Sequence, residues 1–222
     1  MIRHQVSDAF HHETCLDEPA CVPEITALRL VICSAIIVLS DFRGDAMANT
    51  GTVTLKTQRL LLRKFHILDY FSFRKWYKDA AVHRFSRGRQ QKNEYDCVNF
   101  FVRRVYNYYF KRRNRHYFWA VIIDGKMMGF VGFNDNRNGI YSIYYKLAGT
   151  LWHQGYMSEA VQAVMAYMDS QDCRAIVGSC DINNIASYKV MQNAGFRQVK
   201  TVANAIHYAD GSVSDSVRFR YK

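Results

Sequence analysis

The sequence lacks several patterns that would each assign the protein to a class. It contains no CxxC pair, no GxGxxG, no GxxxxGK followed by Ser or Thr, and no apolar run that approaches 20 residues. The missing glycine-rich patterns remove support for dinucleotide-binding and P-loop nucleotide sites. Six cysteines with no disulfide-like density and no export signal make a reducing cytoplasm the expected location. The short apolar runs argue against a membrane span.

Residues 1 to 46 differ in composition from the rest of the chain. They hold three basic and seven acidic residues, a balance of −4, so the remainder carries +15 against a whole-chain net charge of +11. Both prolines and three of the six cysteines also lie there. We therefore place a domain boundary near Met47 and interpret residues 1–46 as a weakly structured extension or the product of an upstream start codon. A docked strand or helix is the alternative.

Two features of this leader resemble functional signals. The apolar run Leu30 to Leu39 is too short to span a bilayer and too far along the chain for a secretory signal. A membrane-anchored enzyme would rest on this run alone, so no membrane association is predicted. His11, His12, Cys15 and Cys21 fit no common zinc spacing, so no metal site is predicted either.

The whole chain is apolar and basic enough to exclude some classes and to leave others open. Apolar residues make up 49% and aromatic residues 14% of 222 residues, which excludes a wholly disordered, collagen-like or low-complexity protein. One domain with an appendage is the expected size class. A sequence pI near 9.4 requires an anionic ligand, a nucleic acid or a membrane surface to be considered as a partner.

From residue 52 onward the hydrophobic pattern alternates between strands and helices. Strands are expected at Thr52 to Phe65, Tyr117 to Ile123, Lys126 to Phe133, Ile140 to Leu147, Arg174 to Cys180, and on both sides of Asp210-Gly211. Helices are expected after Asp69 as cap, at Tyr95 to Asn114, at Ser158 to Met168 and at Ile185 to Ala194. Asp124-Gly125 predicts a tight hairpin turn. The pattern indicates an α/β fold with strands of mixed direction.

One junction, YSIYYKLAG followed by TLWHQGYMSEA, joins a strand to a helix through a short loop. A strand that ends at Gly149 and a helix that starts near Ser158 leave several backbone N–H groups without intrahelical partners, and such groups attract anions. Gly155 permits close approach, and the Ser158 hydroxyl adds a donor. The loop would suit a diphosphate, although many strand-to-helix turns of this kind bind nothing.

A second group of polar residues lies in CDINNIASYKVMQNAGF. Asn184 and Ser187 are expected one helical turn apart on the same side, where a carboxamide and a hydroxyl could meet a ligand between neighbouring strands. The alternative is that Asn184 is only a helix N-cap and Ser187 an ordinary helix serine.

Taken together, these stretches resemble the GNAT N-acetyltransferase superfamily, in particular its branch of ribosomal-protein N-terminal acetyltransferases. The matching pieces are TQRLLLRKF, FWAVIIDGKMMGFVGF, WHQGYMSEA and DINNIASYKVMQNAGF, in the family's order, between Val53 and Tyr221. The resemblance implies a GNAT-like α/β fold over residues 47–222, with a mixed, mostly antiparallel twisted sheet flanked by about four helices. Residues 1–46 have no counterpart.

The resemblance also implies an activity, which is transfer of an acetyl group from acetyl-CoA to a primary amine by direct attack on the thioester. The amine would belong to a peptide or protein N-terminus or to a small molecule. The strand ending at Leu147 would pair with the pantetheine arm, Asn184 would hydrogen-bond it, and Ser187 would help protonate the departing thiolate. The implied diphosphate ligands are the backbone amides of His153, Gln154, Gly155, Tyr156, Met157 and Ser158.

The chain also departs from the family's pattern. Trp152 and Met157 are bulky where relatives have Arg or Gln and a small residue, so phosphate approach is expected to be tighter. Ser142 replaces a common glutamate base, and Met191 stands where many relatives carry a tyrosine acid. The general base stays open between Asp135, Glu159, His116 and a water chain.

A basic and aromatic stretch, Arg103 to Phe118, leaves a second function open. Its five arginines, one lysine and tyrosines could contact RNA phosphates and bases, and Arg103 to Arg115 could thus reach a ribosome. The alternative is a solvated helix face whose aromatic stripe packs in the core. A catalytically weak GNAT-fold binding module that associates with RNA or a ribosome is therefore the second hypothesis. Both a monomer and a homodimer are compatible with the sequence.

Overall fold

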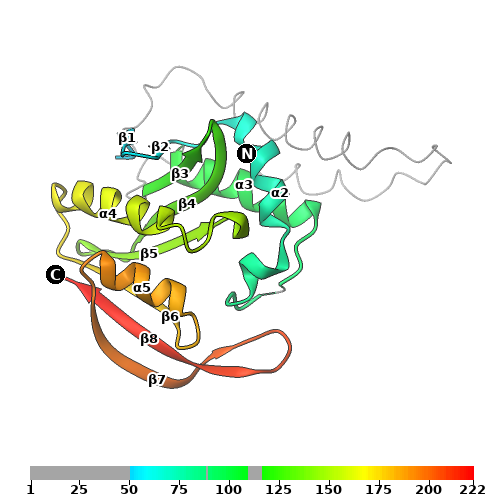
Figure 1. The fold of residues 1–222 in the computed structure, drawn as a ribbon. Helices are drawn as coiled ribbons and strands as arrows, with labels where there is room; N and C mark the ends of the chain where they lie inside the picture. The colour runs from blue at the N-terminus through cyan, green and yellow to red at the C-terminus, as the bar shows by residue number, and fades with distance from the viewer. Residues whose placement is uncertain (1–50, 89, 110–116) are drawn as a thin grey trace, which may run out of the picture.

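The computed structural model describes residues 51–88, 90–109 and 117–222 (Figure 1). They form one eight-stranded sheet in the order β1-β2-β3-β4-β5-β6-β8-β7. The strands are β1 (Leu55–Lys56), β2 (Leu61–Arg63), β3 (Tyr117–Ile123), β4 (Lys126–Asp135), β5 (Ile140–Leu147), β6 (Ala175–Asp181), β7 (Arg197–His207) and β8 (Val213–Tyr221). Every neighbouring pair is antiparallel except β5 and β6, which are parallel.

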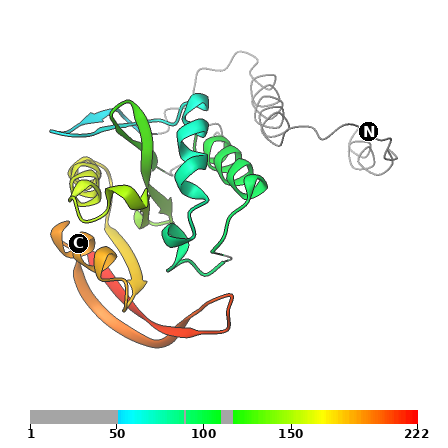
Figure 2. The ribbon, with the colours of Figure 1, turned by 45° about the vertical axis from the view of Figure 1, so that its right-hand side comes forward.

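Helices cover both faces of this sheet. The helical segments are η1 (Ile67–Asp69), α2 (Tyr70–Tyr77), η2 (Ala80–His83), α3 (Glu94–Tyr109), η3 (Gly149–Leu151), α4 (Tyr156–Asp169) and α5 (Ile185–Asn193). Figure 2 shows α2 and α3 on one side of the sheet and α4 on the other. The described residues thus contain four α-helices, and the predicted fold class is confirmed.

The alternation of side chains along β3 explains why both faces are covered. All seven residues of β3 are buried. Trp119 and Val121 belong to the core beneath α4 and α5, whereas Phe118 and Ala120 belong to the core beneath α2 and α3. A strand that is apolar on both sides of its pleat cannot face water on either side, so each face requires its own helical layer.

The first predicted strand, Thr52 to Phe65, is wrong as a single element. The structure breaks it into β1 and β2, which pair with each other as an antiparallel hairpin. The Thr57 backbone N–H donates to the Leu60 carbonyl at 3.0 Å, and the Leu60 N–H donates back to the Thr57 hydroxyl at 2.9 Å. A threonine that accepts hydrogen bonds from nearby backbone favours a turn over a continuous strand.

The other elements lie close to their predicted positions. Asp124 and Gly125 both have positive φ, at 48° and 72°, and they join the paired ends of β3 and β4 as the hairpin signal predicts. Helix α4 begins two residues before Ser158, and α5 is followed by Gly195 at φ 83°. The predicted end of the helix at Asn114 lies outside the described residues.

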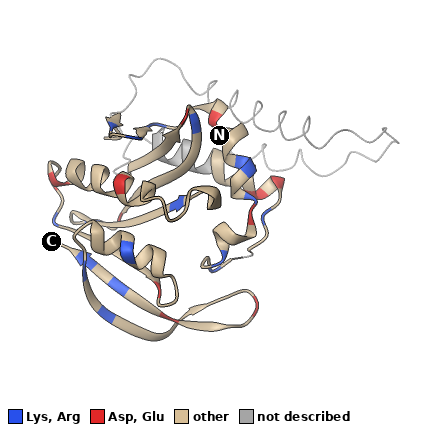
Figure 3. Ribbon diagram, in the orientation of Figure 1, with Lys and Arg blue, Asp and Glu red and all other residues tan. Residues whose placement is uncertain are grey.

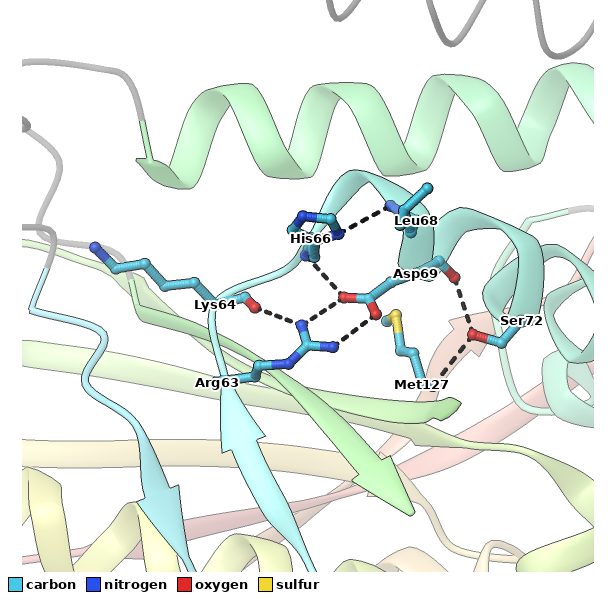
Figure 4. A network of polar contacts seen from close by, with 7 residues as sticks. All are labelled: Arg63, Lys64, His66, Leu68, Asp69, Ser72 and Met127. Carbon is cyan, nitrogen blue, oxygen red and sulfur yellow. Dashed lines mark hydrogen bonds and ion pairs between the residues drawn. The ribbon is translucent and has the colours of Figure 1, made fainter. Parts of the chain in front are cut away.

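Asp69 does not cap α2 in the predicted way. Its carboxylate instead accepts two hydrogen bonds from the Arg63 guanidinium, at 2.7 and 2.8 Å, and one from the His66 backbone N–H at 2.7 Å (Figure 4). The Asp69 carbonyl accepts from the Ser72 hydroxyl, which in turn accepts from the Met127 N–H. This chain of contacts joins β2, α2 and β4, so it fixes the helical layer on that half of the sheet.

Within the described ranges, no helix has both the length and the apolar character needed to cross a bilayer. The apolar run Leu30 to Leu39 lies outside them.

Candidate active site

The two parallel strands at the middle of the sheet separate after a short paired stretch. Strand β5 pairs with β6 only from Ile140–Ser142 to Ala175–Val177. Beyond Ser142, no described strand pairs with this edge of β5. The remainder of β5, residues 143–147, therefore borders an opening in the sheet, which we call the β5–β6 opening.

Backbone groups of β5 point into this opening. The Ala148 N–H donates to the Met128 carbonyl at 2.8 Å, which makes this a hydrogen-bonded pair of the antiparallel ladder between β4 and β5. Because such pairs alternate along a ladder, Ile143, Tyr145 and Leu147 turn their N–H and C=O groups away from β4. The Ile143 N–H is used in the pairing of Ser142 with Val177, so the groups presented to the β5–β6 opening are those that follow it, chiefly the N–H and C=O of Tyr145.

The inner end of the opening is closed by packing. A Cβ atom added to Gly178 would lie 2.4 Å from Met191 Cε and 3.2 Å from Ile143 Cγ2, so a larger residue would displace the end of the Met191 side chain. Met191 itself is buried. A buried thioether carries no proton to give, so the position at which relatives have a tyrosine acid contributes packing here.

The outer end of the opening is formed by the loop between β5 and α4. His153 and Gly155 both have positive φ, at 61° and 80°, which turns the chain sharply before the helix. The first intrahelical bond is from the Glu159 N–H to the Gly155 carbonyl at 3.0 Å. The N–H groups of Tyr156, Met157 and Ser158 precede that bond, so they lie at the positive end of the α4 dipole.

Trp152 and Met157, the two bulky residues of this loop, do not occupy the same place. The Trp152 indole N–H donates to the Leu147 carbonyl at 3.0 Å, so Trp152 covers the last carbonyl of β5 and does not bind the backbone of Tyr145. The Met157 side chain is buried in the core beneath α4. His153, Gln154 and Gly155 remain exposed.

Arg59, which the sequence pattern did not single out, holds this loop in place. Its Nε atom lies 2.7 Å from Glu159 Oε2, one of its terminal nitrogens donates to the Gln154 carbonyl at 3.0 Å, and its guanidinium carbon lies 4.3 Å from the Tyr156 ring centre. The Thr57 hydroxyl donates to the second Glu159 oxygen at 2.6 Å. The turn between β1 and β2 is thereby bonded to the start of α4.

These contacts decide the role of Glu159. Burial opposes ionisation of its carboxyl, but hydrogen bonds from Thr57 and Arg59 outweigh burial and lower its pKa below the usual value. A carboxylate that is bound on both oxygens and has a lowered pKa is a weak proton acceptor. Glu159 is therefore a poor candidate for the general base.

Asn184 and Ser187 lie together on the first turn of α5. The Asn184 side-chain oxygen accepts from the Ser187 backbone N–H at 3.1 Å, which is an N-cap, and no described residue binds its side-chain nitrogen. The Ser187 carbonyl accepts from the Tyr145 hydroxyl at 3.1 Å. Because burial raises the pKa of Tyr145, that hydroxyl stays a donor and joins β5 to α5. Tyr188 turns away and donates to Gln198 at 2.9 Å.

A pocket of about 280 Å³ lies at the far end of β6. Arg84 and Phe85 line it from the segment after η2, and Tyr208 and Asp210 line it from the turn between β7 and β8. Asp181, the last residue of β6, is buried in its wall. Burial opposes ionisation of Asp181, but hydrogen bonds from the Tyr208 hydroxyl and the Asn183 N–H outweigh burial and lower its pKa.

Lys146 is a partly buried cation on β5. Its ammonium donates to the Val82 carbonyl at 2.9 Å and to the Ser86 hydroxyl at 2.8 Å, so it joins β5 to the segment around η2. Both acceptors are neutral. Burial, with a smaller contribution from Lys92, lowers the pKa of Lys146 to about 8 from its ordinary value of 10.5.

This lowered pKa predicts a pH-dependent stability. The unfolded chain binds the Lys146 proton more tightly than the folded protein does. Burying the charged ammonium therefore destabilises the folded state fully below about pH 8, and this destabilisation disappears as the pH rises towards 10.5. We compare the free energy of unfolding of the natural protein with that of the Lys146→Met variant. The first minus the second should increase between about pH 8 and pH 10.5. Urea unfolding of both proteins at several pH values measures the difference, in which titrations of groups that do not interact with Lys146 cancel. A difference that stays constant with pH would contradict the burial of a charged Lys146.

Of the other residues considered as a general base, as metal ligands or as ribosome contacts, only Asp135 has a side chain that the structure describes. Asp135 accepts a hydrogen bond from the Arg137 N–H at 2.7 Å, and His116 lies outside the described residues. The side chains of Arg103 to Arg115 and the residues His11, His12, Cys15 and Cys21 lie outside them as well. In the described part of the chain, no group of three or more His, Cys, Asp or Glu residues could hold a metal ion.

Comparisons with known proteins show the family and the fold. A family model described as an acetyltransferase (GNAT) domain matches residues 59–197. A search of curated proteins found no significant sequence match. Among solved structures, a GNAT-family acetyltransferase from Bacillus anthracis is similar with a TM-score of 0.64 and 24% identity, covering 76% of this chain and 98% of that one.

Two further similar structures hold cofactors. RimL, a ribosomal L7/L12 alpha-N-protein acetyltransferase solved with coenzyme A, has a TM-score of 0.64 and 19% identity, covering 76% of this chain and 97% of its own. The microcin C7 self-immunity acetyltransferase MccE, solved with acetyl-CoA and AMP, has a TM-score of 0.62 and 18% identity, covering 74% and 93%. With the family model spanning more than half of its residues, the chain belongs to the GNAT acetyltransferase family.

Proposed function

We propose that this GNAT acetyltransferase uses acetyl-CoA to acetylate a primary amine, which belongs to a peptide or protein N-terminus or to a small molecule. The observation that carries the proposal is the β5–β6 opening, which has the Tyr145 backbone N–H and C=O on one side and the start of α4 at its outer end. The similarity to structures solved with coenzyme A and with acetyl-CoA supports this choice of cofactor.

The proposed cofactor position follows from the chemistry of its parts. The diphosphate lies at the loop of His153 to Ser158, where backbone N–H groups and the α4 dipole favour an anion. The pantetheine arm carries amides and lies in the β5–β6 opening, where it pairs with the backbone of Tyr145 as an added strand would. The side-chain nitrogen of Asn184 donates to the same arm from α5.

Because a thioester is already activated, the protein mainly has to align the amine with the thioester carbonyl. A neutral amine attacks the thioester carbonyl, the carbon–nitrogen bond forms, the carbon–sulfur bond breaks, and the thiolate leaves with a proton that Ser187 helps to supply. Because Glu159 and Asp181 both have lowered pKa values, neither is a suitable base, and the amine loses its proton to Asp135, His116 or a water chain. The acceptor enters through the pocket at the end of β6.

A screen for free-thiol release tests this function. The full chain, acetyl-CoA and a panel of peptides with different N-terminal residues, together with small amines, should release coenzyme A with at least one acceptor, and mass spectrometry should find the acetyl group on its amine. The similarity to RimL favours peptide acceptors in the panel. Release of thiol without any acetylated amine would instead indicate hydrolysis, and no release with any acceptor would count against the proposal.

A further inference from the structure

The sheet ends in a long hairpin, β7–β8, whose strands place cations directly opposite one another. Arg197 pairs with Arg220, and Lys200 pairs with Arg218. All four side chains are exposed. Like charges at directly opposed positions of an antiparallel pair repel each other, so this arrangement is unfavourable for the hairpin by itself.

The four cations share the face of the sheet that lies opposite α5. Val217 and Phe219 are buried, and the Phe219 ring lies 5.2 Å from the ring of Tyr188 in α5. Since side chains alternate along a strand, Arg218 and Arg220 point to the opposite face, and their cross-strand partners point with them. We call this surface the β7–β8 basic face.

Strand β6 extends this face with uncharged residues. Val177 pairs with Arg220, and Ser179 pairs with Arg218. Beside each cationic pair, β6 therefore places a small or apolar neutral residue. None of these six positions holds an aromatic residue. The face offers charge and hydrogen-bond donors but no ring on which a base could stack.

The next pair on the same face, Asp181 opposite Ser216, carries a carboxylate, but it is buried and bound by the Tyr208 hydroxyl. Across the described ranges, no carboxylate forms an ion pair with Arg197, Lys200, Arg218 or Arg220. Figure 3 shows the basic segments of β7 and β8 gathered toward the C-terminal end of the hairpin, with the acidic segments toward its turn. Asp169, near the C-terminus, is bound by Lys222 at 2.7 Å. The charge on the basic face is thus not neutralised by the described part of the chain.

We propose that the β7–β8 basic face binds the phosphate backbone of an RNA. A polyanion with regularly spaced charges matches cations arranged in successive cross-strand pairs. Three of the four are arginines, whose planar guanidinium groups bind phosphate through two parallel hydrogen bonds. Without aromatic rings, the contact reads the backbone and does not depend on base sequence.

This surface lies apart from the residues proposed to hold acetyl-CoA, so its test is separate from that of the transferase activity. The probe is a fluorescein-labelled single-stranded RNA of about 20 nucleotides, titrated with the full chain at 50 and 200 mM salt and followed by anisotropy. The variant is Arg218→Gln with Arg220→Gln. The matched control, Lys75→Gln with Lys126→Gln, removes the same charge from exposed lysines on α2 and β4.

The natural protein should bind the RNA, and four phosphate contacts would weaken binding about 50-fold between the two salt concentrations. The double variant of Arg218 and Arg220 should bind at least tenfold more weakly at 50 mM salt, with a salt slope smaller by about 1.4, because two contacts are lost. The control should differ from the natural protein by less than about twofold. The melting temperature of the Arg218 and Arg220 variant should be equal or higher, because repulsion is removed.

Three results would overturn the proposal. The first is unchanged affinity and salt slope in the Arg218 and Arg220 variant. The second is an equal loss in the control, which would indicate that overall charge and not this face binds RNA. The third is absence of RNA binding by the natural protein together with binding to vesicles of phosphatidylserine and phosphatidylcholine that the variant loses, which would assign the face to a membrane surface.

Discussion

Arg59→Ala should raise the KM for acetyl-CoA about tenfold, equivalent to roughly 1.4 kcal/mol, with little change in kcat. Arg59 binds the Gln154 carbonyl and neutralises Glu159, one residue after the last N–H of the proposed diphosphate site. Without Arg59, the Glu159 carboxylate would face the diphosphate with its charge uncompensated. The ion pair itself is exposed and adds little to stability, so we expect the fold to tolerate the change.

Two comparisons separate this role from a general structural one. Acetyl-pantetheine carries the thioester but no diphosphate, so Arg59→Ala should leave its KM within about twofold of the natural protein's value. Adding Glu159→Gln to Arg59→Ala removes the uncompensated charge and should restore most of the acetyl-CoA affinity, whereas Glu159→Gln alone should have a small effect. An equal penalty with both donors, or no recovery in the double variant, would contradict the assigned role of Arg59.

The Asn184 side chain should be required for efficient acetyl transfer through its nitrogen and not through its cap. Asn184→Ala removes both the N-cap oxygen and the side-chain donor, and it should lower kcat/KM for acetyl-CoA about tenfold or more. Asn184→Ser keeps an oxygen that can cap α5 but has no amide nitrogen. If the nitrogen binds pantetheine, the serine variant should lose nearly as much activity as the alanine variant while its melting temperature stays near that of the natural protein.

The opposite pattern would change the assignment. A serine variant with full activity, beside an alanine variant that is less stable and less active, would make Asn184 a helix cap only. Both variants should be compared at the same fraction of folded protein, because loss of an N-cap costs about 1 kcal/mol by itself.

The sequence predicted most elements because their patterns are local. The residues Asp124-Gly125 determine a turn through their own backbone preferences, and the apolar repeat of α4 is visible within one helix. The strand predicted at Thr52 to Phe65 failed for a local reason too, since a threonine turn interrupts it. The Thr57 hydroxyl can compete for backbone hydrogen bonds, which favours a turn. The β-branched residues 52–54 before it favour a strand more strongly, so the pattern predicted a strand.

The site was only partly predictable, because its decisive contacts join distant residues. The glycine loop and the Asn184 turn could be placed from the sequence, and the structure brings them to the two sides of one opening. Arg59 reaches Glu159 across 100 residues of chain, and Tyr145 reaches Ser187 across 42. No spacing rule within one element predicts such pairs. The role of Met191 as packing against Gly178 also depends on tertiary contact.

We propose above all that the β5–β6 opening and the loop before α4 bind acetyl-CoA. Thermal unfolding of the full chain with and without millimolar acetyl-CoA tests it most directly. Ligand at about 100 times its Kd adds roughly 2.7 kcal/mol to the folded state, which raises the Tm of a domain of this size by about 5 to 10 °C. We predict a rise of this order, and a smaller one for Arg59→Ala. An unchanged Tm at millimolar acetyl-CoA would contradict the account.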